Sequence, residues 1–400
     1  MRRQSGEKKG VSGSVEVTIH PSQFPECVRA DLLESLRTRR INHKFHYDSI
    51  KQTHKWLELH QAYSPSRTDT DCEATYLRAF EAVCGKMEKF TNLIGLGCGG
   101  GQKDSQLLQR LRHTGAEVCY VPCDVSVAMV LTARETALGV LPGLKCHPVV
   151  CDLATAQDLP QTLVKLGVPT EGRLVTFFGM LPNFEPEIVL PRLAGFLASE
   201  DRLLLSANLA PGSDYDAGVR KILPLYDNPL TREWLMIFLT DLGVEREDGE
   251  LLFGIETSPL ERLVLEPRDV PPHPGPLPKG EGEPFGGAGK SRGPLNSPAR
   301  SKSALSPWEE GRGEGKRDLK AGVSRLKRVV ANFRFVRARS FSVGSEEFNL
   351  RPGDNIGLFF SYRHTPEIVR KLTSSVGLRV LEQWLTRSGE EGVFLLERAG

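Results

Sequence analysis

The stretch NLIGLGCGGGQK, residues 92–103, decides the fold of this chain. Its first part, residues 92–96, is apolar almost throughout and predicts a buried strand. Glycines follow, and an amphipathic helix is predicted from Ser105 to Arg112. Glycine at such a turn lets the backbone approach a ligand closely, and the first amides of the helix favour a carboxylate or a phosphate. The stretch therefore predicts a loop that binds a nucleotide-like cofactor.

Strands and helices alternate around this loop. Further strands are predicted over residues 118–122, 147–151, 173–178 and 202–207, and helices over residues 126–137 and 187–197. This alternation predicts an α/β fold with a doubly wound parallel sheet, covered by helices on both faces. Ligands bind at the carboxyl ends of the strands in such sheets. In this sequence those ends carry small or polar residues: Gly97, Asp124, Asp152 and Asn183.

The C-terminal end adds a second signature. Residues 377–385 and 392–397 predict two strands joined by the polar turn 386–391. A parallel sheet that finishes in such a hairpin, with its last strand antiparallel, is typical of the Rossmann-like fold of class I methyltransferases. A simple dinucleotide-binding domain does not predict it. We therefore expect the class I methyltransferase fold with S-adenosylmethionine as the cofactor.

The spacing of the glycines argues against a nicotinamide cofactor. The nicotinamide dinucleotide fingerprint has glycines at its first, third and sixth places. Gly97, Gly99 and Gly101 supply the first, the third and a fifth place, but the sixth place holds Gln102. We therefore place a nicotinamide-dependent oxidoreductase third among the hypotheses, behind a methyltransferase and a non-catalytic binding module.

Side chains at the strand ends predict how the cofactor is held. Asp124 can accept hydrogen bonds from both ribose hydroxyls, and Asp152 can accept one from the adenine amino group. The backbone of Leu153 can meet a ring nitrogen, and Lys103 is placed to meet the methionine carboxylate. The alternative for each aspartate is a helix cap or a turn, and the alternative for Lys103 is the surface of a helix.

Composition excludes several classes of protein. The formal net charge of the 400 residues is +2, so no global basic field indicates binding to nucleic acid or to an anionic membrane. The chain has no apolar run of about 18 residues and no apolar stretch behind its first charged residues, so we expect neither a membrane span nor a secretion signal. The 8 scattered cysteines suggest a reduced cytoplasm and no metal site.

For its partners, we expect a small amine-bearing molecule as the substrate, and we expect the protein to be a monomer.

The length predicts more than one structural part, because one core rarely extends over 400 residues. The predicted parts are a disordered tail (1–20), the N-terminal part of a second, substrate-binding lobe (21–87), the methyltransferase core (88–212), the rest of the lobe (213–362) and the C-terminal part of the core (363–400). Within the lobe, residues 266–320 are rich in proline, glycine and charge. Such a composition buries too little apolar surface to offset the entropy of ordering, so this insertion is predicted to be disordered.

Six motifs lie along the chain: KFHYD (44–48), AYSPSRT (62–68), LGCGGGQKD (96–104), PCDVS (122–126), FGMLPNFEP (178–186) and LYDN (225–228). Together they resemble the histidine-specific N-alpha-methyltransferases of ergothioneine biosynthesis. The resemblance covers most of the chain outside the tail and the insertion. It implies that the substrate amino acid lies between the core and the second lobe.

The resemblance also assigns residues to this pocket. Asn183 and Tyr226 would hold the carboxylate of the amino acid, and Tyr47 and Tyr63 would form the walls around its amine. Methyl transfer to an amine needs a neutral nitrogen in line with the sulfonium methyl, so positioning and desolvation do most of the work and no catalytic residue is assigned. Aromatic walls also suit the quaternary ammonium that would form. The alternative for both tyrosines is packing in a core.

One stretch departs from the family pattern. Residues 358–364 match a strand in which the family uses a glutamate and a serine to meet the imidazole; Ser361 is retained, but Phe359 replaces the glutamate. An apolar ring cannot satisfy an imidazole N–H, and a buried donor without a partner costs about 1–3 kcal/mol. We therefore expect a different acceptor, either a hydrophobic or aromatic amino acid or another small amine. A narrower alternative is the reaction of the family itself, which converts histidine to its trimethyl betaine. The alternative from another class is a non-catalytic module of the same fold that binds the cofactor.

Overall fold

The computed structural model describes residues 14–86, 92–115, 117–170, 172–258 and 325–399. The insertion predicted over residues 266–320 lies outside these described residues. By their contacts, all described residues belong to one unit.

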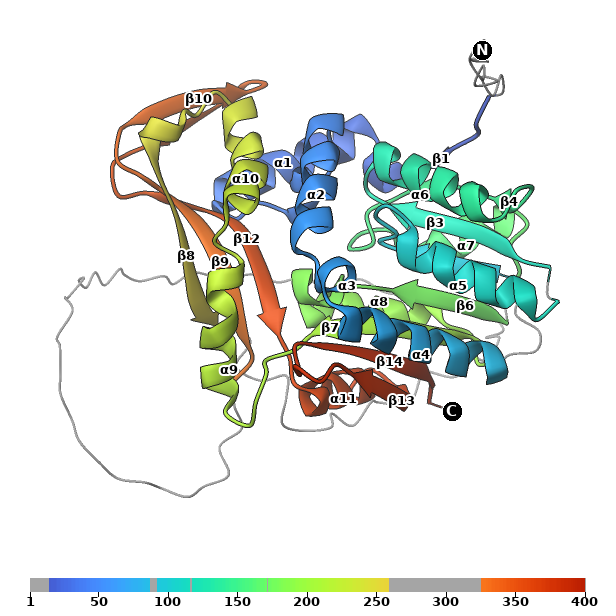
Figure 1. Ribbon diagram of the computed structural model, residues 1–400. Helices are drawn as coiled ribbons and strands as arrows, with labels where there is room; N and C mark the ends of the chain where they lie inside the picture. Colours follow the sequence, from blue (N-terminus) through green and yellow to red (C-terminus); the bar gives the residue numbers. More distant parts are fainter. Residues whose placement is uncertain (1–13, 87–91, 116, 171, 259–324, 400) are drawn as a thin grey trace, which may run out of the picture. The chain divides into compact units, whose positions relative to one another are not determined.

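A nine-stranded sheet forms the centre of the fold, with the order β1-β5-β3-β2-β6-β7-β14-β13 and β4 beside β3 (Figure 1). The strands are β1 (Thr18–Ile19), β2 (Asn92–Leu96), β3 (Cys119–Asp124), β4 (Lys145–Cys146), β5 (Val149–Val150), β6 (Arg173–Phe177), β7 (Arg202–Asn208), β13 (Leu378–Leu385) and β14 (Glu391–Arg398). All neighbours pair in parallel except β14, which is antiparallel to both β7 and β13. This order, with its terminal hairpin, confirms the predicted class I methyltransferase fold.

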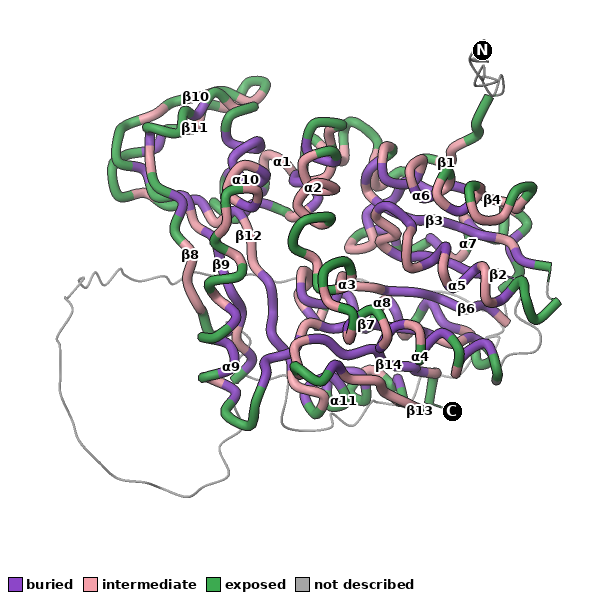
Figure 2. Tube along the Cα trace, viewed as in Figure 1, coloured by how far each residue is buried: buried purple, intermediate pink, exposed green. Residues whose placement is uncertain are grey.

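Helices cover both faces of the sheet, which explains why the central strands β2 and β6 are buried at every position (Figure 2). On one face lie α4 (Thr70–Lys86), α5 (Gln102–His113) and α6 (Val127–Val140), and on the other α7 (Leu159–Lys165), α8 (Pro186–Phe196) and α11 (Pro366–Ser374). Neighbouring residues of one strand point to opposite faces: Leu93 packs with α4 and α5, and Ile94 packs in the cluster of the other face.

A second group of elements has a core of its own. It contains α1 (Pro25–Thr38), α2 (Ile50–Tyr63), α10 (Pro229–Asp241), the antiparallel sheet β12-β9-β8 (Asn355–Arg363, Lys327–Phe335, Gly249–Thr257) and the hairpin β10-β11 (Arg339–Val343, Glu346–Leu350). Its apolar cluster includes Leu36, Phe45, Trp234 and Phe333. The remaining helices are α3 (Pro65–Thr68), α9 (Tyr215–Ile222) and five 3-10 turns: η1 (Pro21–Gln23), η2 (His43–His46), η3 (Leu181–Asn183), η4 (Leu223–Leu225) and η5 (Arg246–Asp248).

Two predicted boundaries need correction. Thr18–Ile19 form β1 and pair with β5, so the predicted disordered tail does not extend to residue 20. The lobe segment predicted over residues 21–87 ends earlier, because Tyr76 and Phe80 of α4 pack on the large sheet. None of the described helices combines the length and the apolar character that a bilayer crossing requires.

Candidate active site

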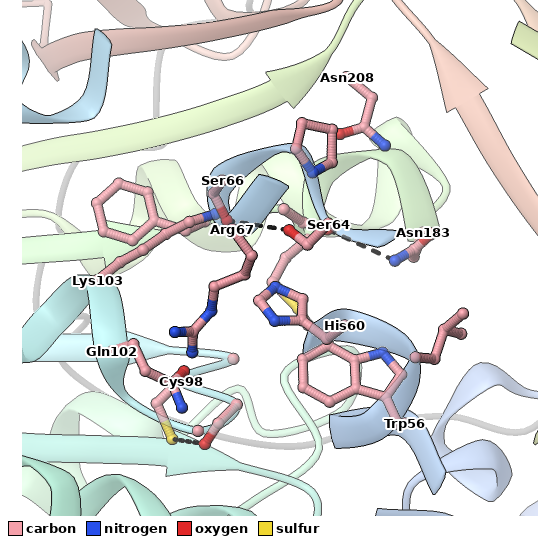
Figure 3. Close-up of a pocket in the computed structure, with 18 of the residues that line it drawn as sticks. Trp56, His60, Ser64, Ser66, Arg67, Cys98, Gln102, Lys103, Asn183 and Asn208 are labelled. Atoms are coloured by element: carbon pink, nitrogen blue, oxygen red, sulfur yellow. Dashed lines mark hydrogen bonds between the residues drawn. The ribbon is translucent and has the colours of Figure 1, made fainter. Parts of the chain in front are cut away.

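A cavity of about 380 Å³ lies at the carboxyl ends of the central parallel strands. Most of the predicted site residues line it: Tyr47, Tyr63, Gly97, Gly99, Lys103, Asp124, Leu153, Asn183, Tyr226, Phe359 and Ser361. Figure 3 shows one side of this cavity, where Trp56, Asn183 and Gln102 come from α2, η3 and α5. The structure thus brings residues from both groups of elements to one site, and their individual binding roles stay predictions.

The glycine loop is shaped by contacts that exclude side chains. Gly97, Gly99 and Gly101 all have positive φ, at 69°, 51° and 73°. A Cβ at Gly97 would lie 2.6 Å from the side chain of Met180. A Cβ at Gly101 would lie 2.6 Å from the Cα of Ala133. Gly101 does not line the cavity and lets α5 approach α6, so its predicted contact with the cofactor stays a prediction.

Asp124 joins this loop to the end of β3. Its carboxylate accepts hydrogen bonds from the amide of Gly99 at 3.1 Å and from the amide of Ser126 at 3.2 Å. The side chain is buried at the cavity wall, and burial raises the pKa of Asp124 to about 6. A buried carboxylate with free acceptor capacity fits a ligand that donates hydroxyls.

Asp152 is the other predicted cofactor residue that does not line the cavity, and its contact with adenine stays a prediction. Its carboxylate is buried away from the cavity lining, where it accepts from the amide of Ala154 at 2.8 Å and lies 3.4 Å from Nζ of Lys44. Lys44 is itself buried and also pairs with Asp31. A buried ammonium needs carboxylate partners, so Asp152 is held toward Lys44. The neighbouring Leu153 does line the cavity.

Lys103 belongs to a buried chain of polar groups that sequence reasoning missed. Its Nζ donates to the hydroxyl of Tyr76 at 3.0 Å and lies 4.2 Å from the centre of that ring. Tyr76 in turn donates to the carboxylate of Glu391, at the first position of β14. Burial lowers the pKa of Lys103, and the charge of Glu391 opposes that shift. Nothing in the sequence links these three positions.

The cavity side of β12 carries Phe359 and Ser361, the two residues of this strand that were predicted to contact the acceptor. Phe359, Ser361 and Arg363 alternate along the strand and all line the cavity, since every second residue of a strand shares a face. The hydroxyl of Tyr226 donates to Ser361 at 2.8 Å and accepts from Nη2 of Arg363 at 2.6 Å. Sequence reasoning missed Arg363, although the period of two from Phe359 and Ser361 could have found it.

Aromatic rings from α2, α10 and β12 line the cavity, and Trp56 reaches the glycine loop, where a Cβ at Gly99 would lie 3.2 Å from its ring. The ring of Tyr47 lies 5.8 Å from Trp56 and 5.5 Å from Trp234, and the ring of Phe359 lies 5.9 Å from Trp234 and 6.0 Å from Tyr226. Both tryptophans were missed as site residues, because a tryptophan on an apolar helix face predicts only packing.

The rim of the cavity is more open than the aromatic wall. Tyr63 is 48% exposed, so it stands at the rim rather than inside an amine pocket. His60 stacks on Trp56 with ring centres 4.9 Å apart (Figure 3). Burial lowers the pKa of His60 to about 3, so it is uncharged at neutral pH.

Comparison with known proteins identifies the family. The family described as histidine-specific, S-adenosylmethionine-dependent methyltransferases matches residues 28–229, which is about half of the chain and includes the glycine loop, Asp124 and η3. The chain belongs to this family. S-adenosylmethionine is therefore its cofactor, as the strand ends predicted.

Two curated relatives are similar to parts of the chain. Histidine N-alpha-methyltransferase of Mycobacterium tuberculosis is 29% identical over 212 residues, which cover 51% of this chain and 60% of the relative. N-methyltransferase imqF of Aspergillus flavus is 28% identical over 167 residues, which cover 42% of this chain and 44% of the relative. The chain thus matches less than two thirds of the length of either relative.

Among solved structures, the likeness is distant. Magnesium protoporphyrin IX methyltransferase from Synechocystis PCC 6803, with SAH bound, is 17% identical with a TM-score of 0.31. The alignment covers 53% of this chain and 91% of that chain.

The residues of the cavity fit this cofactor. Gly97 and Gly99 keep the loop free of side chains, and the buried carboxylate of Asp124 suits the two ribose hydroxyls. Leu153 and Lys103 also line the cavity, where they would meet the adenine ring and the methionine carboxylate as predicted. When bound, S-adenosylmethionine supplies an electrophilic methyl group on its sulfonium.

Proposed function

We propose that this protein transfers a methyl group from S-adenosylmethionine to the amine of a small molecule, and that free histidine is not its preferred acceptor. One observation carries the second half of the proposal. Phe359 lies in the cavity wall between Trp234 and Tyr226, where it would contact the side chain of the acceptor.

The cavity walls suit amine methylation. The ring of Tyr47 lies 5.8 Å from that of Trp56 and 5.5 Å from that of Trp234 along one part of the cavity lining, and such apolar surface favours the neutral form of an amine over its ammonium form. Their ring faces also stabilise the positive charge that the nitrogen gains on methylation. The protein would act by positioning the nitrogen and excluding water, without a covalent intermediate.

An imidazole finds no carboxylate on this wall. Four carboxylates line the cavity among the described residues: Glu73, Asp104, Asp124 and Glu391. They come from α4, α5, the end of β3 and the start of β14, and none lies on β12. An imidazole N–H against Phe359 would lose a partner, which costs about 1–3 kcal/mol, or roughly five- to 150-fold in affinity.

Mass spectrometry of the products from a mixture of amino acids and simple amines, with isotopically labelled S-adenosylmethionine, tests this function. We expect a labelled product from an acceptor other than histidine. Calorimetric titration with S-adenosylhomocysteine gives an independent reading of the cofactor site. Cofactor binding without methyl transfer to any member of the mixture would favour the alternative, a non-catalytic binding module. Efficient trimethylation of histidine would contradict the altered substrate.

Assembly and location belong to the same proposal. We propose a monomer that contacts no nucleic acid and acts in the cytoplasm. The free thiols of all 8 cysteines agree with a reducing compartment. Light scattering coupled to gel filtration measures the assembly, and a stable dimer would contradict the monomer.

A further inference from the structure

Glu185 joins two parts of the site through its side chain. It lies two residues after Asn183, at the N-cap of α8, where an acidic side chain usually accepts from the first amides of its own helix. In this structure the side chain makes no such bond. One carboxylate oxygen accepts from the hydroxyl of Tyr362, and the other accepts from Nη1 of Arg328 at 3.0 Å. Both partners belong to the antiparallel sheet, on β12 and β9.

The two partners of Glu185 are buried and bound to one another. Nη1 of Arg328 also donates to the hydroxyl of Tyr362 at 3.4 Å, and the exposed Arg40 lies 3.7 Å from the carboxylate. Burial and the neighbouring carboxylate raise the pKa of Tyr362, so its hydroxyl keeps its proton and donates it to Glu185. Such a group favours one geometry, because moving one member leaves a buried charge without its partner.

These three side chains lie behind the residues that line the cavity. None of the three lines it. Side chains alternate along β12, so Tyr362 points away from the face that carries Ser361. Asn183, two residues before Glu185, does line the cavity. The group therefore connects the turn η3, which is predicted to hold the acceptor, with the rear of the strand that lines the same space.

We propose that Glu185 is a positioning residue for methyl transfer: it holds η3, and with it Asn183, at a fixed distance from the cavity side of β12. This inference rests on the proposed function, because it concerns an acceptor held between these two elements. η3 follows β6 of the large sheet, whereas β12 belongs to the second group of elements. The acceptor nitrogen must lie in line with the sulfonium methyl, and a displacement of about 1 Å can lower the rate about a hundredfold.

The cofactor half of the site is held by other contacts. The amide of Gly99 bonds to Asp124, and Lys103 bonds to Tyr76. These residues come from the glycine loop, the end of β3, α5 and α4. Loss of the Glu185 charge should therefore impair the acceptor step and spare cofactor affinity. A general loss of stability does not produce that combination.

Glu185→Gln tests this role, because it removes the charge and keeps the shape of the side chain. Wild type and variant are assayed with labelled S-adenosylmethionine against histidine, phenylalanine, tryptophan and the amines that lack their carboxylates. Steady-state constants are then measured with the compound that the wild type methylates fastest. We expect kcat to fall at least about tenfold, while the Kd for S-adenosylhomocysteine stays within about twofold of the wild-type value.

Glu256→Gln is the matched control. Glu256 lies on β8, is 47% exposed and accepts from Nη2 of Arg328 at 3.3 Å, so its loss removes the other carboxylate partner of the same guanidinium. We expect wild-type kcat and cofactor affinity in this variant. Tyr362→Phe removes one hydrogen bond from Glu185 and should lower kcat less than Glu185→Gln does. The double variant should be no slower than Glu185→Gln, since both changes act through one contact.

Hydrogen exchange followed by mass spectrometry reports on η3 without any acceptor. The amide of Asn183 bonds to the carbonyl of Met180 at 2.9 Å in this turn. In Glu185→Gln we expect faster exchange in peptides over residues 178–186 and wild-type exchange in peptides over residues 92–104. Glu256→Gln should change neither region.

The outcomes are distinct from those of the proposed function. Wild-type kcat in Glu185→Gln would overturn the inference and leave amine methylation intact. Exchange that rises equally in both regions would also overturn it, because uniform loosening reflects stability alone. If Glu185→Gln does not fold, the same two readings on Tyr362→Phe decide. Absence of methyl transfer by the wild type to every compound would overturn the proposed function, and the exchange readings would still decide whether Glu185 fixes η3.

Discussion

The hydroxyl of Tyr76 donates a hydrogen bond to the carboxylate of Glu391, and both groups are buried beside the cofactor loop. Tyr76 lies on α4 and Glu391 at the start of β14, so this bond joins two elements that are far apart in the sequence. The same hydroxyl accepts a hydrogen bond from the ammonium of Lys103. The position and charge of Lys103 therefore depend on Glu391, a residue that belongs to none of the motifs in the sequence.

Replacing Glu391 with glutamine should weaken cofactor binding. The carboxylate opposes the burial that lowers the pKa of Lys103, so its loss favours the neutral amine and frees Tyr76 to turn. We expect about a tenfold rise in the Kd for S-adenosylhomocysteine, which corresponds to about 1.4 kcal/mol, measured by calorimetric titration at pH 8. Glu390→Gln is the matched control, because Glu390 does not line the cavity. Equal affinities in the two variants would contradict this coupling.

Cofactor affinity should depend on pH through Asp124. Burial raises its pKa to about 6, and only the ionised carboxylate can accept from both ribose hydroxyls. The affinity for S-adenosylhomocysteine should therefore rise from pH 5 to pH 7 and then level off. Asp104 titrates in the same window, but its oxygens already accept from Tyr120 and Thr176. Asp124→Asn should bind weakly with a flat profile, and a steep profile in that variant would count against the assignment.

The same carboxyl should act on stability in the opposite direction. The unfolded group loses its proton near pH 4 and the folded group near pH 6, so the folded state binds more protons between these values. The stabilisation is present below pH 4 and is lost as the pH rises toward 6. Denaturant unfolding of the protein without cofactor should show a smaller loss over this window in Asp124→Asn than in the wild type. Identical losses would contradict the raised pKa.

Alanine at Gly101 should destabilise the fold more than alanine at another glycine of positive φ. Both Gly101 (φ 73°) and Gly143 (φ 84°) hold the left-handed conformation, which costs an alanine about 1–2 kcal/mol. Only at Gly101 would the new Cβ overlap a neighbour, the backbone of Ala133, whereas nothing lies within 4 Å at Gly143. Chemical denaturation should therefore show a clearly larger loss for Gly101→Ala. Similar losses would mean that α6 moves away without cost.

Glutamate at position 359 should raise the turnover of histidine. A carboxylate there could accept the imidazole N–H that the ring of Phe359 cannot, beside the hydroxyl of Ser361. We expect kcat/KM for histidine to rise at least about tenfold over the wild type. Phe359→Leu, which changes shape without adding an acceptor, should show no such rise. Unchanged histidine turnover in Phe359→Glu would show that the account of this wall is wrong.

The sequence predicted the large sheet well and the site less completely. Strands such as β2 and β6 are mainly apolar, and a glycine follows each of them within two residues, so local composition was sufficient. Asp152 was assigned to the cofactor by its place after a strand. In the structure the carboxylate of Asp152 pairs with Lys44, 108 positions away in the sequence. A buried ammonium needs a carboxylate partner, and the sequence does not show that Lys44 is buried next to Asp152.

What the sequence by itself determined is the class I sheet, the cofactor loop and the family, because periodicity, glycine spacing and motif order are local properties of the chain. Tertiary structure alone decided which partners the polar and charged side chains of the cavity have. Tyr76 and Glu391 meet Lys103 only after β14 inserts beside β7, and Arg363 faces Tyr226 only because β12 contacts the end of the large sheet. Buried charges interact strongly across short distances in space, and no pattern along the chain encodes those distances.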